Sequence, residues 1–247
     1  MSKKIALVTG GIGGIGTAIC KQLCKDGYTV VANHIAAEAE RAAAWLAEMR
    51  AAGNDVHLAE GDVSSFDSCA AMVAKIKAEV GSVDILVNNA GITKDGMFKK
   101  MPLENWMAVI NINLNSVFNV SRQVIDDMLE KGWGRVINIS SINGQKGQFG
   151  QTNYSAAKAG MHGFTKALAQ ETAAKGITVN TISPGYIGTD MVMAIKEEVR
   201  NQIIAGIPVG RLGKPDEIAK LVSYLASDDA GFITGANIAI NGGQHMF

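Results

Sequence analysis

The chain has 247 residues, enough for a sizeable core, and 47% of them are hydrophobic. Its 23 basic residues balance 23 acidic ones, which argues against a nucleic-acid partner or an anionic membrane surface. No apolar run approaches membrane-spanning length, and the three cysteines lack C-x-x-C or zinc-type spacing, so we expect a cytoplasmic protein with no metal site.

Short apolar segments alternate with helical segments along nearly the whole chain. The expected strands are residues 5–9, 28–33, 55–59, 83–88, 134–140, 177–182 and 236–240. Buried strands separated by helices predict an α/β fold, in which a parallel sheet is covered on both faces. Right-handed crossovers then give one Rossmann-type domain over 1–247, doubly wound, with about seven strands and with ligands at their carboxyl ends.

The first expected strand runs into a glycine-rich segment, Thr9-Gly10-Gly11-Ile12-Gly13-Gly14-Ile15-Gly16, and a helix follows. Glycines permit a tight turn and let backbone N–H groups approach a pyrophosphate at a helix N-terminus. We assign dinucleotide binding to Gly10, Gly13, Gly14, Ile15 and Gly16. A merely glycine-rich turn is the alternative, but the position directly after the first strand argues against it.

The end of the second strand bears on the choice of cofactor. It reads Ala32-Asn33-His34, without the carboxylate that would bind the ribose 2′-hydroxyl of NAD. The missing negative charge favours NADP, and an acid introduced at Asn33 is expected to reverse that preference. Arg41 is the nearest cation downstream, and it could bind the 2′-phosphate or be a solvated helix residue.

Polar residues follow the third and fourth strands. In Gly61-Asp62-Val63, Asp62 could accept from the adenine amino group or cap the next helix. Asn88-Asn89-Ala90-Gly91 suits a loop that bonds across strands and lets a ribose lie close. Asn113 lies within a helical region expected over 103–130, where an asparagine is usually a satisfied polar residue.

Tyr154 and Lys158 are four residues apart, so on a helix they would share one face. A tyrosine has a pKa of about 10, and a nearby ammonium would lower it toward the range of efficient acid–base catalysis. Ser141 stands at the end of a strand, where its hydroxyl could bond a substrate carbonyl. Alone, this pair could equally be an ordinary surface tyrosine and lysine.

Together these residues resemble the short-chain dehydrogenase/reductase family. The motifs are Thr9-Gly10-x-x-x-Gly14-x-Gly16, Asn88-Asn89-Ala90-Gly91, Asn113, Ser141, Tyr154-x-x-x-Lys158 and Pro184-Gly185, in the family's order and spacing. The resemblance implies that Tyr154 is the general acid/base, that Lys158 lowers its pKa and binds the nicotinamide ribose, and that Ser141 polarises the carbonyl. It also implies that Asn113 holds a water of a proton relay.

Further cofactor contacts follow from the resemblance. They are assigned to Val63, Asn89, Ala90, Gly91, Pro184, Gly185, Ile187 and Thr189, the last at the nicotinamide carboxamide. The resemblance also implies a homotetramer formed through the helices of 103–130 and 154–174, where Ala156, Ala157, Gly160 and Gly163 are small enough for close helix packing. Packing of these small residues on the chain's own sheet is the alternative.

Within the family, segments such as 143–154, 183–187 and 241–246 resemble acetoacetyl-CoA reductases, which implies an acyl-CoA thioester substrate reduced with NADPH to the (R)-3-hydroxy product. Reductases that act on acyl-carrier-protein thioesters are the alternative. Gln148, Phe149, Gln151 and Tyr186 are expected to border the acyl group, with the glutamine amides donating to the thioester and the two rings narrowing the pocket. Asp95 is expected to border its entrance.

The segment after the sixth strand is expected to form a mobile lid over 184–204. Its apolar residues Met191, Met193, Ile195 and Val199 would form an adaptable underside. An ordinary surface helix after a loop, with the same residues packed permanently in the core, is the alternative.

Overall fold

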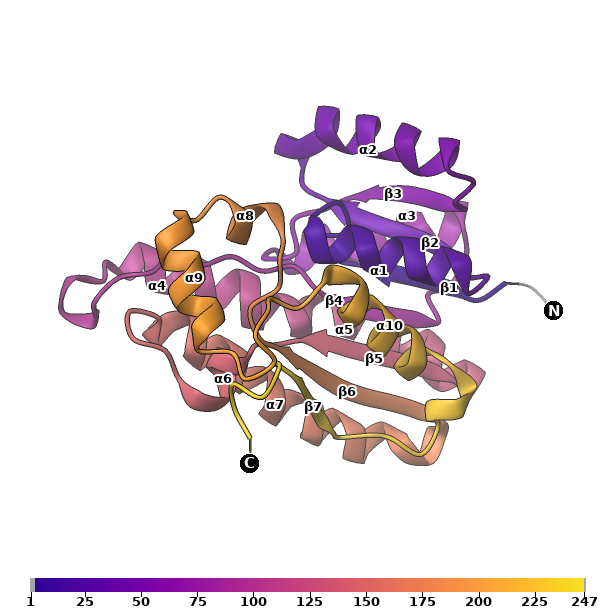
Figure 1. The fold of residues 1–247 in the computed structure, drawn as a ribbon. Coiled ribbons are helices and arrows are strands. Elements are labelled where there is room, and N and C mark those ends of the chain that lie inside the picture. The colour runs from indigo at the N-terminus through magenta and orange to yellow at the C-terminus, as the bar shows by residue number, and fades with distance from the viewer. Residues whose placement is uncertain (1–2, 247) are drawn as a thin grey trace.

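A single sheet of seven parallel strands forms the centre of the structure, a computed structural model that describes residues 3–246. The strands are β1 Ile5–Val8, β2 Thr29–His34, β3 Val56–Glu60, β4 Ile85–Asn88, β5 Gly134–Ile139, β6 Ile177–Pro184 and β7 Asn237–Ile240. Their order across the sheet is β3-β2-β1-β4-β5-β6-β7 (Figure 1). All seven expected strands are confirmed, with ends within two residues of the predicted ones.

Helices lie on both faces of this sheet (Figure 1). They are α1 Gly14–Lys25, α2 Ala39–Ala51, α3 Phe66–Glu79, α4 Leu103–Ile110, α5 Ser116–Lys131, α6 Ile142–Lys146, α7 Thr152–Thr172, α8 Asp190–Met193, α9 Glu197–Ala205 and α10 Pro215–Ala226. The expected long helix of 103–130 is present as α4 and α5, which are joined by a π-helical turn, Asn111–Asn115. Short 3₁₀ turns are Ala36–Glu38, Phe98–Lys100, Ala173–Lys175 and Asp228–Ala230.

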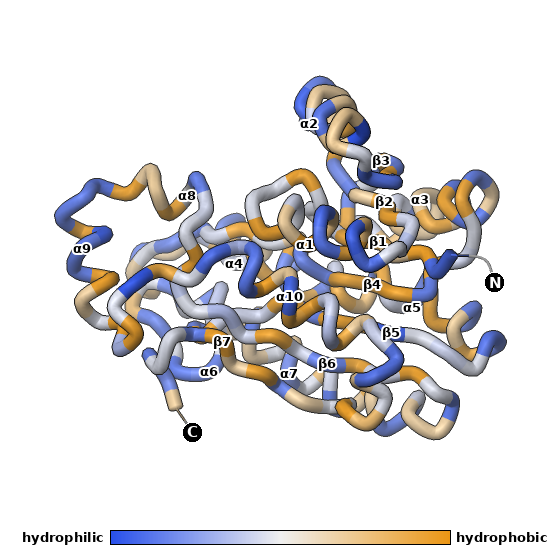
Figure 2. Tube along the Cα trace, turned by 45° about the vertical axis from the view of Figure 1, so that its right-hand side comes forward, coloured by the Kyte–Doolittle hydropathy of each residue, from blue (hydrophilic) through white to orange (hydrophobic). Residues whose placement is uncertain are grey.

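Each strand supplies side chains to two separate cores because successive residues point to opposite faces. In β1, Ala6 and Val8 pack with α1, α2 and α10, whereas Ile5 and Leu7 pack with α3, α5 and α7. Burial on both faces explains why the strands are nearly continuous apolar runs, which stand out in the middle of Figure 2. Within the described residues, no helix combines the length and the apolar character needed to cross a bilayer.

The strand order reverses between β1 and β4. From β1 the chain first adds β2 and β3 on one side, and then β4 to β7 on the other. Parallel pairing brings Val8 of β1 level with Val87 of β4, so the loops that follow both strands emerge side by side. In doubly wound sheets this point, at the carboxyl ends of the strands, is where ligands bind.

Candidate functional site

The glycine-rich turn after β1 is shaped by close backbone contacts. Gly10 has a φ of 59°, a conformation that side chains rarely adopt, and a Cβ atom at Gly16 would collide with the carbonyl oxygen of Gly10. Gly13 is the N-cap of α1, whose first turn carries no acidic residue. The first N–H groups of a helix have no partner within it, so this end of α1 suits a phosphate group.

Asn33 of β2 is hydrogen-bonded to the same turn through its side chain. Its side chain is 2% exposed, its Oδ1 accepts from the N–H of Gly10 at 3.2 Å, and its Nδ2 donates to the carbonyl of Gly61 at 2.9 Å. An aspartate here would lose the donor to Gly61. The reversal of the cofactor preference by an acid at Asn33 stays a prediction, and the lost bond to Gly61 adds a structural cost to that exchange.

Arg41 reaches from α2 to the glycine-rich turn. One guanidinium nitrogen donates to the carbonyl of Ile12 at 2.9 Å, and another pairs with Glu38 at 2.7 Å. The half-exposed guanidinium therefore stands beside the predicted phosphate site. This placement favours phosphate binding over a purely solvated role.

The loop after β4 is tied to the glycine-rich turn. The side-chain amide of Asn89 donates to the carbonyls of Thr9 and Gly10 at 3.0 and 3.1 Å. The N–H groups of Asn89 and Ala90 both donate to the Thr9 hydroxyl at 3.0 Å. The predicted bonding across strands is confirmed.

In the segment after β3, Asp62 does not cap the next helix, which was one of its two predicted roles. Asp62 accepts from the N–H and the hydroxyl of Ser64 at 2.9 and 2.7 Å, and Ser65, not Asp62, caps α3. Asp62 thus shapes the turn beside the buried Val63. Contact of these two residues with adenine stays a prediction.

The π-helical turn between α4 and α5 presents Asn113 toward the loop after β4. Its Nδ2 donates to the carbonyls of Ile92 and Val109, both at 2.9 Å, whereas its Oδ1 is buried and has no hydrogen-bond partner among residues 3–246. A Cβ atom at Gly91 would lie 2.7 Å from that oxygen and 3.5 Å from Lys158 Nζ. A buried acceptor without a partner beside an ammonium fits an additional donor, such as a water or a sugar hydroxyl.

Ser141, Tyr154 and Lys158 meet at the carboxyl end of β5. The Ser141 hydroxyl caps α6 by accepting from the N–H of Asn143 at 3.1 Å, which leaves its own proton for another acceptor. Tyr154 and Lys158 lie one turn apart on α7, as predicted, with Lys158 Nζ 5.6 Å from the centre of the phenol ring. Lys158 is 3% exposed, and its ammonium donates to the carbonyl of Ile139 at 2.8 Å.

The protonation of this pair differs from the expectation. Burial raises the pKa of Tyr154 above its ordinary value, opposed by a hydrogen bond from Ser141 and reinforced by the charge of Asp95. Burial also lowers the pKa of Lys158 to about 7, so its charge is only partial at neutral pH. The net shift of the Tyr154 pKa is therefore upward, because desolvation acts on both groups, and the lowering contribution assigned to Lys158 stays a prediction.

The loop between Ser141 and Tyr154 is bonded to the loop after β4. Gln151 donates to Asp95 at 2.9 Å and accepts from Asn143 at 2.9 Å, while Gln148 accepts from Lys146 at 2.8 Å. The structure therefore commits one N–H of Gln151 within the chain. Phe149 is 84% exposed, so the expectation that it narrows a pocket is wrong for this structure, in which its ring packs against little of the chain.

The segment after β6 returns to the glycine-rich turn. A Cβ atom at Gly14 would lie 3.0 Å from the methyl carbon of Thr189, so these two predicted cofactor contacts are neighbours. Pro184 ends β6, and Gly185 donates to the carbonyl of Ile240 in β7 at 3.0 Å. Ile187 is buried and pairs with Gly213 in an isolated bridge, which fixes the base of the following segment.

The expected lid stands away from the core. Helix α9 has no buried residue, and Figure 2 shows it as mostly hydrophilic. Met193 and Val199 are exposed and Ile195 is half-buried, while the side chain of Met191 lies outside the described residues. The exposure of Met193 and Val199 argues against permanent core packing of these two residues, and the mobile lid stays a prediction. Tyr186 lines a cavity of about 170 Å³ at the base of this segment, and Phe149 is not among its lining residues.

A family model described as short chain dehydrogenase matches residues 4–200. The chain is 63% identical to an acetoacetyl-CoA reductase from Allochromatium vinosum and 63% identical to nodulation protein G from Azospirillum brasilense, in both cases over 98% of this chain and at least 98% of the relative. It is 58% identical to an acetoacetyl-CoA reductase from Cupriavidus necator over the full length of both. The chain belongs to the short-chain dehydrogenase family.

A more distant relative represents the alternative substrate class. A 3-oxoacyl-[acyl-carrier-protein] reductase from Haemophilus influenzae is 44% identical over the full length of both chains. Similarity to acetoacetyl-CoA reductases is therefore the stronger of the two.

As a short-chain dehydrogenase, the chain gathers most of its predicted site residues at one edge of the sheet. The glycine-rich turn is bonded to the loop of 88–91 and lies beside Thr189, and Asn113, Gly91 and Lys158 lie close together next to that loop. Phe149 is exposed, and the cavity lined by Tyr186 does not include Phe149, so these two rings do not border a common cavity. In the described part of the chain, no group of three or more metal-binding side chains is arranged to hold an ion.

The structural roles of three residues at this edge were not predicted from the sequence. Asn33 holds the glycine-rich turn, Asn143 links Ser141 to Gln151, and His162 bonds to two strand ends. For His162 a signal existed, because it follows Lys158 by four residues on the same helical face. For Asn33 and Asn143 the partners are distant in sequence or in irregular loops, where no periodicity marks them.

Proposed function

We propose that this short-chain dehydrogenase reduces acetoacetyl-CoA to (R)-3-hydroxybutyryl-CoA with NADPH. The observation that carries the proposal is the convergence of Ser141, Tyr154 and Lys158 at the carboxyl end of β5, beside a glycine-rich turn, in a chain 63% identical to an acetoacetyl-CoA reductase. NADPH supplies the hydride when it is bound.

The proton of the reaction comes from Tyr154. Its raised pKa keeps the phenol protonated at neutral pH, which is the state needed to donate to the carbonyl oxygen as hydride reaches the carbon. Ser141, whose hydroxyl bonds to Tyr154 in the structure, would donate its proton to the same carbonyl oxygen and orient it. Lys158, with a pKa of about 7, stabilises the phenolate that remains and exchanges protons at neutral pH.

Residues of the glycine-rich edge hold the cofactor. The N-terminus of α1 would take the diphosphate, and Arg41 would take the 2′-phosphate. Asp62 and Val63 would contact the adenine, and the loop of 88–91 would contact a ribose. Lys158 and the segment 184–189 would hold the nicotinamide half, where the unpartnered oxygen of Asn113 would accept from a bridging water.

Steady-state kinetics with acetoacetyl-CoA and with the matching acyl-carrier-protein thioester, each with NADPH and NADH, tests the proposal. We expect the highest kcat/KM for acetoacetyl-CoA with NADPH. A higher kcat/KM for the carrier-protein thioester would instead favour the fatty-acid reductase alternative. Absence of turnover with either thioester would overturn the proposed reaction.

The cofactor preference is tested by Arg41→Ala. Losing a charge-assisted phosphate contact should raise the KM for NADPH about tenfold and leave that for NADH unchanged. The matched control is Arg122→Ala, which removes an arginine that pairs with Asp126 on α5 and should alter neither KM. Equal effects on both cofactors would remove Arg41 from the phosphate site.

We further propose a cytoplasmic homotetramer. Leu103 of α4 is 69% exposed, and Phe118 of α5 is exposed while stacking on Phe66 of α3 at 6.0 Å. Ala156 and Gly163 of α7 are exposed, whereas Ala157 is buried and Gly160 packs against Leu114 of the same chain. The apolar helix faces suit subunit packing, and all three cysteines are free, as in reducing compartments. Light scattering during gel filtration measures the assembly.

A further inference from the structure

His162 lies on the catalytic face of α7, directly below the site. Tyr154, Lys158 and His162 follow at intervals of four residues, so they form one row along the helix. The half-buried imidazole has its Nε2 2.9 Å from the Ser140 hydroxyl and 3.4 Å from the Ser183 hydroxyl. Ser140 immediately precedes Ser141, and Ser183 immediately precedes Pro184.

Counting protons identifies the donor in both contacts. The Ser140 hydroxyl donates its single proton to the carbonyl of Lys158 at 2.9 Å. The Ser183 hydroxyl donates its own to Asn237 Oδ1 at 2.7 Å. Each hydroxyl can therefore only accept from the imidazole, which requires a proton on Nε2 of His162.

The imidazole is neutral under ordinary conditions. Burial lowers the pKa of His162, and the charges of Lys166 and Lys158 lower it further. A neutral imidazole carries one N–H. That proton is on Nε2, so the contacts to Ser140 and Ser183 select the tautomer.

These bonds join four elements of the sheet edge that carries the site. Ser140 directly follows β5, Ser183 lies near the end of β6, Asn237 begins β7, and His162 belongs to α7. We infer that His162 is a positioning residue, whose Nε2–H ties the end of β5 to α7 and thereby sets the Ser141 hydroxyl against the Tyr154 phenol. This inference rests on the reductase activity proposed above.

The geometry at stake is sensitive to small movements. Ser141 and Tyr154 come from different elements, and they act together only when both reach one carbonyl oxygen. Misplacement of a catalytic group by about 1 Å can cost 10²-fold in rate. Ser140 is the link, because its hydroxyl contacts both the Lys158 carbonyl and the imidazole.

Two substitutions of His162 distinguish the effect of its N–H donor from the effect of its side-chain volume. His162→Leu keeps an apolar side chain of similar reach without a donor, whereas His162→Gln retains an N–H donor near the place of Nε2. We expect His162→Leu to lower kcat about tenfold with a KM for acetoacetyl-CoA within about twofold of wild type, and His162→Gln to recover most of kcat. His57→Leu, on β3 at the far side of the sheet, is the matched control and should leave kcat unchanged.

A double-mutant cycle tests the link through Ser140. Ser140→Ala should lower kcat by a similar factor, and adding His162→Leu should cause little further loss, because both changes break the same connection. Additive losses would show that His162 acts independently of Ser140 and would overturn the proposal. So would a kcat of His162→Leu within twofold of wild type, or a Gln variant no better than the Leu variant.

Nitrogen NMR of histidine-labelled protein tests the tautomer without any activity. We expect the resonances that disappear in His162→Gln to be those of an imidazole protonated at Nε2 and neutral at pH 7. A proton on Nδ1 would overturn the inference even if the enzyme is active. An inactive wild-type enzyme with the Nε2–H tautomer present would instead remove the proposed function and leave the structural bond intact.

Discussion

Two buried cations lie near opposite ends of strand β5, and they differ in the number of their hydrogen-bond partners. Arg135, at the amino end of β5, and Lys158, at the carboxyl end, are each 3% exposed. The Arg135 guanidinium donates to the carbonyls of Ser227, Gly134 and Gly176 at 3.2, 2.9 and 3.3 Å. Lys158 has one oxygen partner, the Ile139 carbonyl, among the hydrogen bonds of the described residues.

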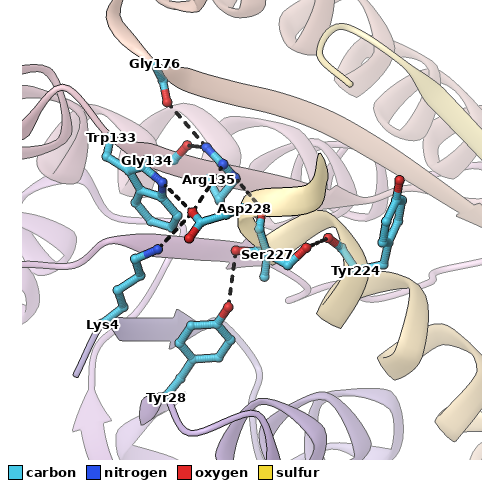
Figure 3. A network of polar contacts seen from close by, with 10 residues as sticks. Lys4, Tyr28, Trp133, Gly134, Arg135, Gly176, Tyr224, Ser227 and Asp228 are labelled. Carbon is cyan, nitrogen blue, oxygen red and sulfur yellow. Dashed lines mark hydrogen bonds and ion pairs between the residues drawn. The ribbon is translucent and has the colours of Figure 1, made fainter. Parts of the chain in front are cut away.

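The surroundings of Arg135 form a closed polar network (Figure 3). Its guanidinium and the Lys4 ammonium lie over the Trp133 ring, at 4.4 and 3.6 Å from the ring centre. Asp228 accepts from both Lys4 and Trp133, at 3.0 and 2.9 Å. Because the donors of this buried guanidinium are paired with carbonyls of different segments, Arg135 links those segments together.

The comparison distinguishes a structural cation from a reactive one. Burial lowers the pKa of Arg135, but Asp228 opposes the shift and a guanidinium stays protonated in proteins. Burial lowers the pKa of Lys158 to about 7, and no carboxylate offsets it. Because the Lys158 amine has few partners, its charged form is destabilised in the fold. A negative charge formed nearby can therefore shift its protonation.

The largest effect expected at the site edge is that of Tyr154→Phe. The phenyl ring keeps the packing and loses the proton, so kcat should fall by about 10²- to 10⁴-fold while NADPH affinity and the melting temperature stay near those of wild type. Steady-state kinetics, cofactor titration and thermal denaturation measure the three quantities. Retention of more than a tenth of wild-type turnover would remove Tyr154 as the acid.

Exchanging each cation for methionine tests the comparison directly. Lys158→Met should lower kcat about 10²-fold without loss of stability, because a buried, poorly paired amine is removed. Arg135→Met should cost about 2 to 3 kcal/mol of unfolding free energy, because buried carbonyls lose their donors, with kcat per folded enzyme within about twofold of wild type. Urea denaturation and active-site titration separate the two quantities. Equal losses of kcat in both variants would show that Arg135 also supports catalysis, and the distinction between a structural and a reactive cation would fail.

The sequence predicts features that depend on local spacing. The strands appear as short apolar runs, and Tyr154 and Lys158 meet because four residues make about one helical turn. It does not predict features set by distant partners. Asn33 bonds to Gly10 and Gly61, which lie on other loops, and the exposure of Phe149 depends on how its loop packs.

The protonation of Tyr154 and Lys158 is also not predicted by local spacing. A lysine near a tyrosine in sequence suggests a lowered phenol pKa, but the depth of burial determines the actual direction. Burial raises the pKa of Tyr154 and lowers that of Lys158 because the charged form of each is desolvated. Only the folded chain contains that information.

The smallest expected effect is the pH dependence of stability due to Lys158. Below pH 7 its amine is protonated in both states, so the folded chain bears the full cost of the buried charge. Between about 7 and the ordinary value of 10.5, the folded amine is neutral and the unfolded one is protonated. The unfolded state then binds more protons, so stability should rise with pH, by at most about 1.4 kcal/mol per pH unit from this group.

Urea denaturation of wild type and Lys158→Met between pH 7 and 8.5 isolates this contribution. The range stays below the ordinary thiol pKa of 9.0, above which the buried cysteines would add an opposite trend. The difference in unfolding free energy between the two proteins should change with pH in favour of wild type, whereas Arg135→Met should keep the wild-type slope. Parallel pH profiles for wild type and Lys158→Met would mean that the Lys158 amine keeps its ordinary pKa in the fold. In that case the contrast between the two buried cations would rest on geometry alone.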